Sequence, residues 1–348
     1  MKKILSICFA ATMFVGCTNT EVEYDNTSKE IGFTAVSGNL TRAVVDGVVY
    51  PTTLNMYVYS WTNGSTAVDY INKGEFVYRN ADSGTAVWGG TTPYFWPNVK
   101  TLHFAGVSAS GNVASATTSY DVENDVITVQ GYTPGASTAE GGNDLMYFPS
   151  TAATKAAGYD KTTTFVPVAM YHTCSWLTFL VKGDAVTGAS GSTYKVTGLT
   201  VTGIDDNADV TCSAANAAKP VTWANNEDGK TATCAVTNGG LGTLTTTAIN
   251  FETAAEYVLA NGTTGNVVVI PQVPGKLTLT YSFESSTGAT ITEEVTGLDL
   301  KVDDDATKNV WEPGKHYVYT ITIKANEILI APTPVDWVES PDHNITIE

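Results

Sequence analysis

The chain has 348 residues, of which 15% are charged, and its formal net charge at pH 7 is −17. A chain this acidic repels the phosphates of nucleic acids and anionic lipid headgroups, so neither is expected as a partner. The low charged fraction, the 31 glycines and the many Thr, Ser, Val and Tyr residues favour short strands joined by turns. The length is that of two domains, each large enough to bury its own core.

The first 16 residues have the pattern of a secretory signal peptide. Lys2 and Lys3 provide the positive end, and the apolar run at 4–15 that follows is too short to span a bilayer. Gly16 and Cys17 resemble the lipobox of bacterial lipoproteins, in which the cysteine becomes the acylated N-terminus. We therefore expect the lipoprotein export machinery to remove residues 1–16 and acyl chains such as palmitate on Cys17 to anchor the precursor in the outer membrane. The alternative is an ordinary signal peptide with an incidental cysteine.

Period-two alternation of apolar and polar residues recurs through the rest of the chain. It is clearest at 277–283 and 317–323, where Leu, Tyr, Phe and Ile share one face and Thr and Ser the other. Strands of this kind, separated by Asn-Gly and Gly-rich turns, predict an all-β protein of two β-sandwich domains in tandem. The polar stretch 150–164 is interpreted as a linker, which places the domains at 43–162 and 163–348.

Several short motifs, taken in order, resemble the fimbrillin family, the subunits of type V pili. These motifs are Ile31-Gly32-Phe33, Thr41-Arg42-Ala43, Met56-Tyr57-Val58-Tyr59, Thr92-Pro93-Tyr94-Phe95-Trp96-Pro97, Leu102-His103-Phe104-Ala105-Gly106, Tyr171-His172, the run from Trp311 to Tyr319, and Val335-Asp336-Trp337. One departure is that family members usually continue the Leu-x-Phe segment with an aromatic residue and a proline, whereas this chain has Ala105 and Gly106.

The resemblance implies a structural subunit of a cell-surface fimbrium that mediates attachment, with sandwiches of transthyretin-like or Greek-key topology. It implies that residues 17–42 form a propeptide whose strand, at 30–40, completes the first domain. A trypsin-like, Arg-specific protease would cut between Arg42 and Ala43, and a strand of another fimbrial subunit would fill the vacated groove. The apolar residues of the tail at 325–348 make it the candidate donor strand.

Three alternatives stay open at this stage. Arg42 is an exposed loop residue if it is not a processing site. The tail at 325–348 closes its own domain if it is not donated. The whole chain is a monomeric surface lipoprotein that binds glycans through exposed aromatic residues if it keeps its N-terminal strand.

The sequence offers no spaced nucleophile and base, no metal-binding cluster and no phosphate-binding loop, so we expect neither enzymatic activity nor a cofactor or metal. The histidines are dispersed, and Asp303-Asp304-Asp305 is interpreted as a solvated turn rather than a calcium site. Trp88 and the aromatic residues at 94–96 are expected to pack in a core or turn rather than stack on sugars. Cys212 and Cys234, on flanking polar strands, are candidates for a disulfide.

Overall fold

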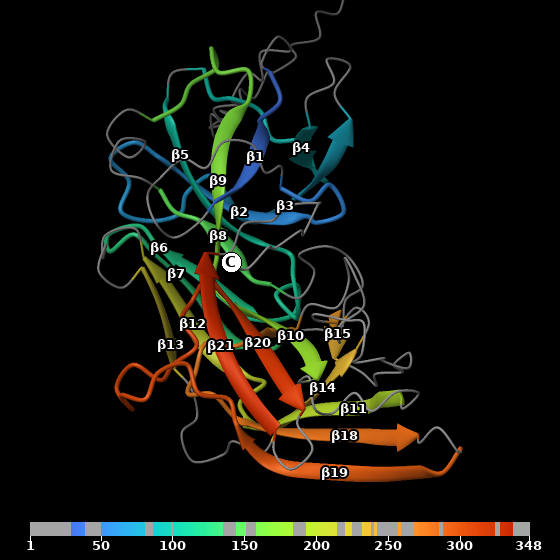
Figure 1. Cartoon of the computed structure of the whole chain (residues 1–348). Helices are drawn as coiled ribbons and strands as arrows, with labels where there is room; N and C mark the ends of the chain where they lie inside the picture. The colour runs from blue at the N-terminus through green and yellow to red at the C-terminus, as the bar shows by residue number, and fades with distance from the viewer. Residues whose placement is uncertain are drawn as a thin grey trace, which may run out of the picture.

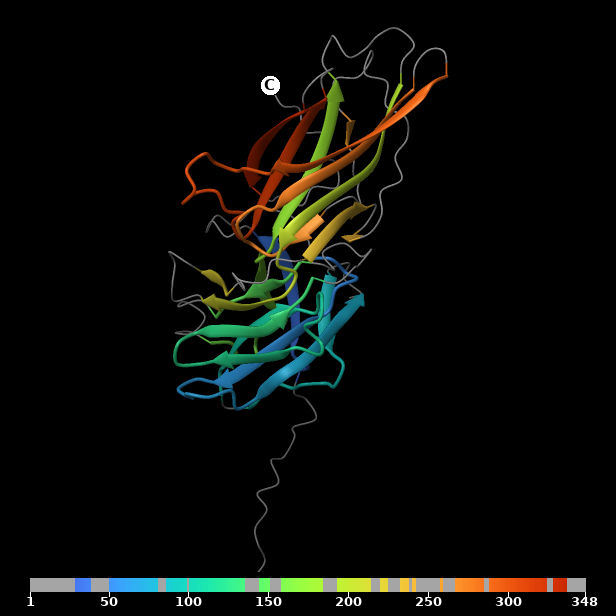
Figure 2. The ribbon, with the colours of Figure 1, turned by 90° about the horizontal axis from the view of Figure 1, so that it is seen from below.

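The structure is a computed structural model that describes residues 29–38, 50–80, 86–98, 100–134, 144–150, 158–183, 193–213, 220–224, 232–237, 240–241, 257–258, 267–284, 288–323 and 328–336. Every regular element in these ranges is a β-strand, which confirms the all-β class. The strands form two halves that lie end to end, with the early strands in one half and most of the late strands in the other (Figures 1 and 2).

The first half is built on a closed barrel of seven strands in the order β1-β4-β3-β2-β5-β8-β9 (Figure 1). Neighbours are antiparallel except for β1 and β9, which run parallel. The expected tandem of two sandwiches is therefore not confirmed, because the alternating strands of this half close on themselves. The barrel strands are β1 (Gly32–Gly38), β2 (Met56–Thr62), β3 (Ile71–Asn80), β4 (Ala86–Gly90), β5 (Leu102–Ser108), β8 (Met146–Phe148) and β9 (Val166–His172).

A four-stranded sheet, ordered β13-β12-β7-β6, packs on the outside of the barrel. Strand β2 shows why both barrel surfaces are apolar there: Met56 and Val58 belong to the interior core, whereas Tyr59 and Trp61 pack outward against this sheet. Strands β12 and β13 come from beyond residue 163 in the sequence, yet β12 pairs with β7 of the first half. The strands of this sheet are β6 (Thr117–Asp121), β7 (Val126–Tyr132), β12 (Ala208–Ser213) and β13 (Val221–Ala224).

The second half consists of two five-stranded sheets that share one core. Leu177 and Phe179 of one sheet and Leu199 and Leu277 of the other are buried in the same cluster. The first sheet has the order β16-β10-β20-β21, with β17 also paired to β10, and the second the order β15-β14-β11-β18-β19. The strands are β10 (Ser175–Gly183), β11 (Thr193–Ile204), β14 (Ala232–Thr237), β15 (Gly240–Leu241), β16 (Tyr257–Val258), β17 (Val267–Val269), β18 (Lys276–Glu284), β19 (Thr290–Asp299), β20 (Lys315–Ile323) and β21 (Ile328–Asp336).

The two halves are joined where β9 leads into β10. The backbone carbonyl of Cys174 accepts a hydrogen bond of 2.8 Å from Gly314 in the second half. On the barrel side, the Cys174 amide donates to the Asp144 carboxylate over 3.2 Å, and that carboxylate also contacts the ring of His172. These groups are buried, so the hydrogen bonds fix the path of the chain between the halves.

Gly106, one of the residues at which the chain departs from the family pattern, lies where neighbouring strands come close. A Cβ atom on Gly106 would lie 2.4 Å from the ring of Phe148 and 2.6 Å from the carbonyl oxygen of Tyr57. The neighbouring strands therefore approach β5 too closely for any side chain at this position.

Candidate functional site

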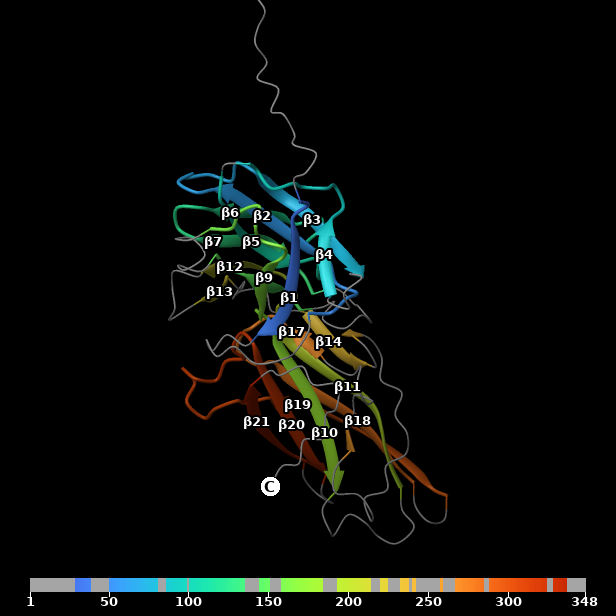
Figure 3. The same ribbon diagram turned by 90° about the horizontal axis from the view of Figure 1, so that it is seen from above.

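Strand β1 closes the barrel, and we call its position between β4 and β9 the β1 site. It pairs with β9 in parallel from Phe33 opposite Val166 to Gly38 opposite Tyr171, and with β4 in antiparallel at two positions (Figure 3). Its sequence alternates as the pleat requires, because Phe33 and Ala35 are buried while Thr34 is partly exposed. The expectation of a strand within 30–40 is confirmed.

Phe33 places the largest side chain of β1 in the centre of the barrel core. Its ring lies 4.9 Å from that of Phe76 and 5.3 Å from that of Phe104, both edge to face, and 6.0 Å from that of Phe148. Full burial of a phenylalanine contributes about 1.5 to 3 kcal/mol, and favourable ring pairs add about 0.5 to 1.5 kcal/mol. A residue of the expected propeptide is thus a central part of the folded core.

The residues just before β1 are held by backbone hydrogen bonds. The amide of Ile31 donates to the carbonyl of Tyr94 over 2.7 Å, and the amide of Trp96 donates to the carbonyl of Lys29 over 3.1 Å. Glu30 forms an isolated bridge with Phe95 between these two bonds. The loop of the Thr-Pro-Tyr-Phe-Trp-Pro motif therefore pairs with the residues just before β1.

Tyr50, the next described residue after Gly38, lies directly beside β1. The Tyr50 amide donates to the Ala35 carbonyl over 3.3 Å, and its ring packs 5.3 Å from that of Trp88. Arg42 and Ala43 lie between Gly38 and Tyr50, outside the described residues. A cut after Arg42 would leave β1 attached to the rest of the protein by non-covalent contacts alone.

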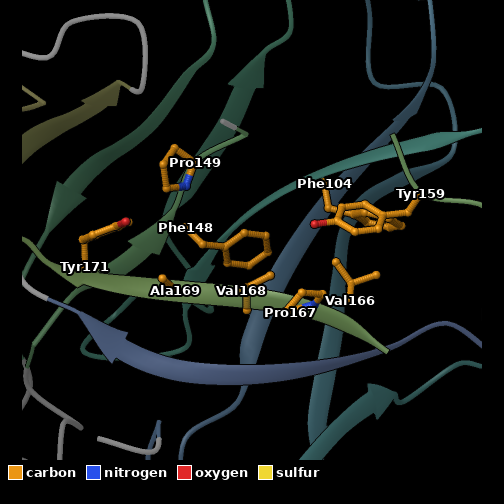
Figure 4. Close-up of a pocket in the computed structure, with 9 residues that line it drawn as sticks. All are labelled: Phe104, Phe148, Pro149, Tyr159, Val166, Pro167, Val168, Ala169 and Tyr171. Atoms are coloured by element: carbon orange, nitrogen blue, oxygen red, sulfur yellow. The ribbon is translucent and has the colours of Figure 1, made fainter. Parts of the chain in front are cut away.

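Strand β9 depends on β1 over most of its length. Strand β8 pairs with β9 only at Tyr171 and His172, so among the described residues the stretch 166–169 has β1 as its single strand neighbour. On the other side of this stretch is an apolar pocket of about 70 Å³ (Figure 4). Its lining residues are Phe104, Phe148, Pro149, Tyr159, Val166, Pro167, Val168, Ala169 and Tyr171. Loss of β1 would leave the backbone of 166–169 without its ladder hydrogen bonds, which is costly unless another strand takes its place.

The tail predicted as a donor strand, 325–348, contains β21, which lies at the edge of its sheet. It pairs with β20 from Ile328 opposite Ile323 to Asp336 opposite Lys315. Pro332 and Pro334 stand opposite Tyr319 and Tyr317, and prolines are tolerated at such an edge because they have no amide to donate. Residues 325–327 and 337–348 of the predicted tail lie outside the described residues.

The remaining predicted residues do not join the β1 site. Cys17 lies outside the described residues. Cys212 is a buried free thiol on β12, and Cys234 lies on β14 in a different sheet. Burial raises the pKa of the Cys174 and Cys212 thiols, which opposes formation of a nucleophilic thiolate.

The aromatic motif and the other polar motifs mainly serve packing and turns. Trp88 and Trp96 are buried, and Phe95, at 39% exposure, does not form a flat aromatic platform with them. The Asp303 and Asp305 carboxylates accept hydrogen bonds from backbone amides two residues further on, as in a solvated turn. Within the described ranges, no three His, Cys, Asp or Glu side chains are placed to hold a metal ion.

The sequence did not identify Phe76 and Phe148 as partners of Phe33, or Arg79 as a partner of Glu30. Each comes from a strand far away in the chain, and alternation shows that a side chain faces inward without showing what it meets. In the described part of the chain, no helix has the length and apolar character needed to cross a membrane.

Comparison with known proteins identifies the family to which the chain belongs. The model of the fimbrillin-like family matches residues 41–337, so the chain belongs to this family. A fimbrial protein from Bacteroides vulgatus ATCC 8482 has a similar fold, with a TM-score of 0.59 and 16% identity over 89% of this chain and 99% of that one. A candidate cell adhesion protein from Bacteroides uniformis ATCC 8492 matches with a TM-score of 0.45 and 16% identity over 89% and 99% of the two chains. No curated protein matches. Family membership supports a fimbrial role at the cell surface.

Proposed function

We propose that this chain is a structural subunit of a cell-surface fimbrium and assembles by exchange of β1 for a strand of another subunit. The observation that carries the proposal is the position of β1 upstream of Arg42: it completes the barrel core but would be detached by a single cut. Only two arginines occur in the chain, Arg42 and Arg79, so an Arg-specific protease has few choices.

In this proposal the subunit is exported as a precursor acylated at Cys17 and held at the outer membrane. The uncut precursor keeps β1 in place, and the filled barrel has no open edge that would promote premature association. After the cut between Arg42 and Ala43, β1 leaves, and β4 and β9 present unpaired backbone groups to an incoming strand.

The tail of a neighbouring subunit is the proposed donor. Its edge strand β21 can detach while β20 keeps its pairing with β10 over eight residue pairs. Burial of each large apolar side chain in a new barrel contributes about 1.5 to 3 kcal/mol, which in sum stabilises a polymer. The resulting fibre would mediate attachment, which is the role implied by the family resemblance.

The test is an SDS gel of native cell-surface protein without boiling, comparing the natural chain with Arg42→Ala. Strand-exchanged polymers are expected to survive as a ladder for the natural chain, and Arg42→Ala is expected to run as a folded monomer. A ladder of equal strength from Arg42→Ala would refute the requirement for cleavage. A single monomer band from the natural chain would refute the assembly itself and favour the monomeric glycan-binding lipoprotein.

A further inference from the structure

The Arg79 side chain passes over β4 and contacts the segment that precedes β1. It lies on β3 opposite Val87 of β4, and its guanidinium donates to the Glu30 carboxylate over 3.1 Å and to the carbonyl of Gly90. One cation therefore contacts both β4, which borders the β1 site, and the segment that leads into β1.

Gly89 makes this path possible. A Cβ atom on Gly89 would lie 2.9 Å from both Cδ and Nε of Arg79, so the arginine side chain lies in the space that any other residue would fill. Gly89 is also the residue of β4 that pairs with Gly32 of β1. Arg79 therefore lies at the end of the β1 site where β1 begins, beside the first residues of the strand that occupies the site.

The contact is one of opposite charge in a protein with a large negative net charge. Both side chains are partly exposed, at 44% for Arg79 and 34% for Glu30, so the pair acts as a selective contact more than as a major source of stability. When β1 leaves, Glu30 leaves with it. The guanidinium of Arg79 then keeps its hydrogen bond to the Gly90 carbonyl but no longer has the Glu30 carboxylate as a partner.

We propose that Arg79 selects the strand that refills the β1 site by pairing with a carboxylate just before the first inward-facing residue of that strand. This inference rests on the proposed strand exchange. An ion pair of this kind requires an acidic residue at the register of Glu30, followed by apolar residues at the registers of Ile31 and Phe33.

The chain itself contains a second segment with this pattern. The dipeptide Glu-Ile occurs twice, at Glu30-Ile31 and at Glu327-Ile328, and each is followed by an apolar residue two positions later, Phe33 or Ile330. Ile328 begins β21, the edge strand of the second half. The occupant is therefore the strand from Glu327 onward of a second copy of this chain, inserted in the direction of β1 with Glu327 against Arg79.

The first part of the experiment measures how firmly the cut segment is held. Full-length chain is cut with an Arg-specific protease, and release of the N-terminal fragment is followed by size-exclusion chromatography. Glu30→Gln is expected to release the fragment about two- to fivefold faster, and Lys29→Gln, which changes the neighbouring charge, is expected to behave as the natural chain. Equal release rates for Glu30→Gln and the natural chain would overturn a holding role for Arg79.

The second part measures assembly of the cut chain as ladders on unboiled SDS gels. Arg79→Gln and Glu327→Gln are each expected to slow assembly about two- to fivefold, and the double variant is expected to be no slower than either, as for residues that act as a pair. Glu339→Gln, another tail carboxylate, serves as the control. Arg79→Glu combined with Glu327→Lys is expected to restore assembly lost in Arg79→Glu, and lysine avoids a new arginine cleavage site.

The outcomes separate the two proposals. Ladders that form at the natural rate in Glu327→Gln, or strictly additive effects in the double variant, would overturn pairing of Arg79 with Glu327 and leave strand exchange intact. Absence of any ladder from the cut natural chain would refute the proposed function and with it any strand for Arg79 to select.

Discussion

Phe33 of β1 lies edge-on to Phe76 of β3, with ring centroids 4.9 Å apart and ring planes at 85°. This contact joins a residue upstream of Arg42 to the core of the barrel, whose strands otherwise come from downstream. In the proposed assembly, the same segment is a structural part of the uncut chain and the part that cleavage after Arg42 would release.

Replacing Phe33 with Ala should destabilise the uncut chain by about 3 to 5 kcal/mol, the usual cost of deleting a buried phenyl ring. Thermal or denaturant unfolding of the first half measures the effect. Thr34→Ala, on the partly exposed face of the same strand, is the control and should cost much less. Equal stability of Phe33→Ala and the natural chain would show that β1 is not part of the cooperative core.

Replacing Cys17 with Ala should abolish acylation and release the precursor from the membrane fraction. The reason is that in the proposed precursor the Cys17 thiol carries the acyl chains that hold the protein to the membrane. Metabolic labelling with a fatty acid and fractionation of the cells measure the outcome. Normal lipid labelling of Cys17→Ala would contradict the assignment.

Truncation after Lys324 should abolish polymer formation while leaving a monomer that melts cooperatively. Strand β21 is at the edge of its sheet, so its loss removes one neighbour of β20 and leaves the pairing of β20 with β10. Unboiled SDS gels and thermal melts measure the two properties. Global unfolding of the truncated chain would mean that the tail closes its own half, and the donor strand would have to lie elsewhere.

The free energy of unfolding should fall at alkaline pH, first near pH 9 because burial raises the pKa of the Cys174 and Cys212 thiols, and then above pH 10 because burial raises the pKa of tyrosines. Burial raises the pKa of Tyr317 from 10 to about 12, so between these values the unfolded state loses a proton that the folded state keeps. The stabilisation is complete below pH 10 and lost as pH rises through about 12, with a slope of at most about 1.4 kcal/mol per pH unit from this residue.

Denaturant unfolding at a series of pH values tests this slope. Tyr317→Phe cannot ionise, so its stability should fall less steeply than that of the natural chain above pH 10. Below pH 10 the two proteins should show the same pH dependence, because both keep the buried thiols of Cys174 and Cys212. Identical slopes for the two proteins above pH 10 would show that Tyr317 does not contribute to the alkaline transition.

The sequence predicted the strands well because their alternation records which side chains face a core. The run at 277–283 became β18, and the run at 317–323 lies within β20. Alternation does not record which sheet a strand joins. Met56 and Val58 face one core and Tyr59 and Trp61 another, so β2 has two buried faces and the closed barrel could not be distinguished from a sandwich.

The β1 site was predicted in part. The strand itself followed from the pattern of Ile31, Phe33 and Ala35, whereas its removal stays a prediction that rests on the family resemblance and the position of Arg42. The ion pair between Arg79 and Glu30 was not predicted, because it depends on the position of β4 between β3 and β1 and on the missing side chain of Gly89. The sequence also did not predict that Cys212 and Cys234 lie in different sheets. The strand of Cys212 joins the four-stranded sheet on the barrel, and the strand of Cys234 joins a sheet of the second half.

The most direct test of the account is the N-terminal sequence of the subunit in assembled fimbriae, together with mass spectrometry of the polymer. The account predicts that the subunit begins at Ala43 and that peptides from β1, including Phe33, are absent from the polymer. A polymer whose subunits begin upstream of residue 30, or that retains β1 in stoichiometric amount, would contradict strand exchange at the β1 site.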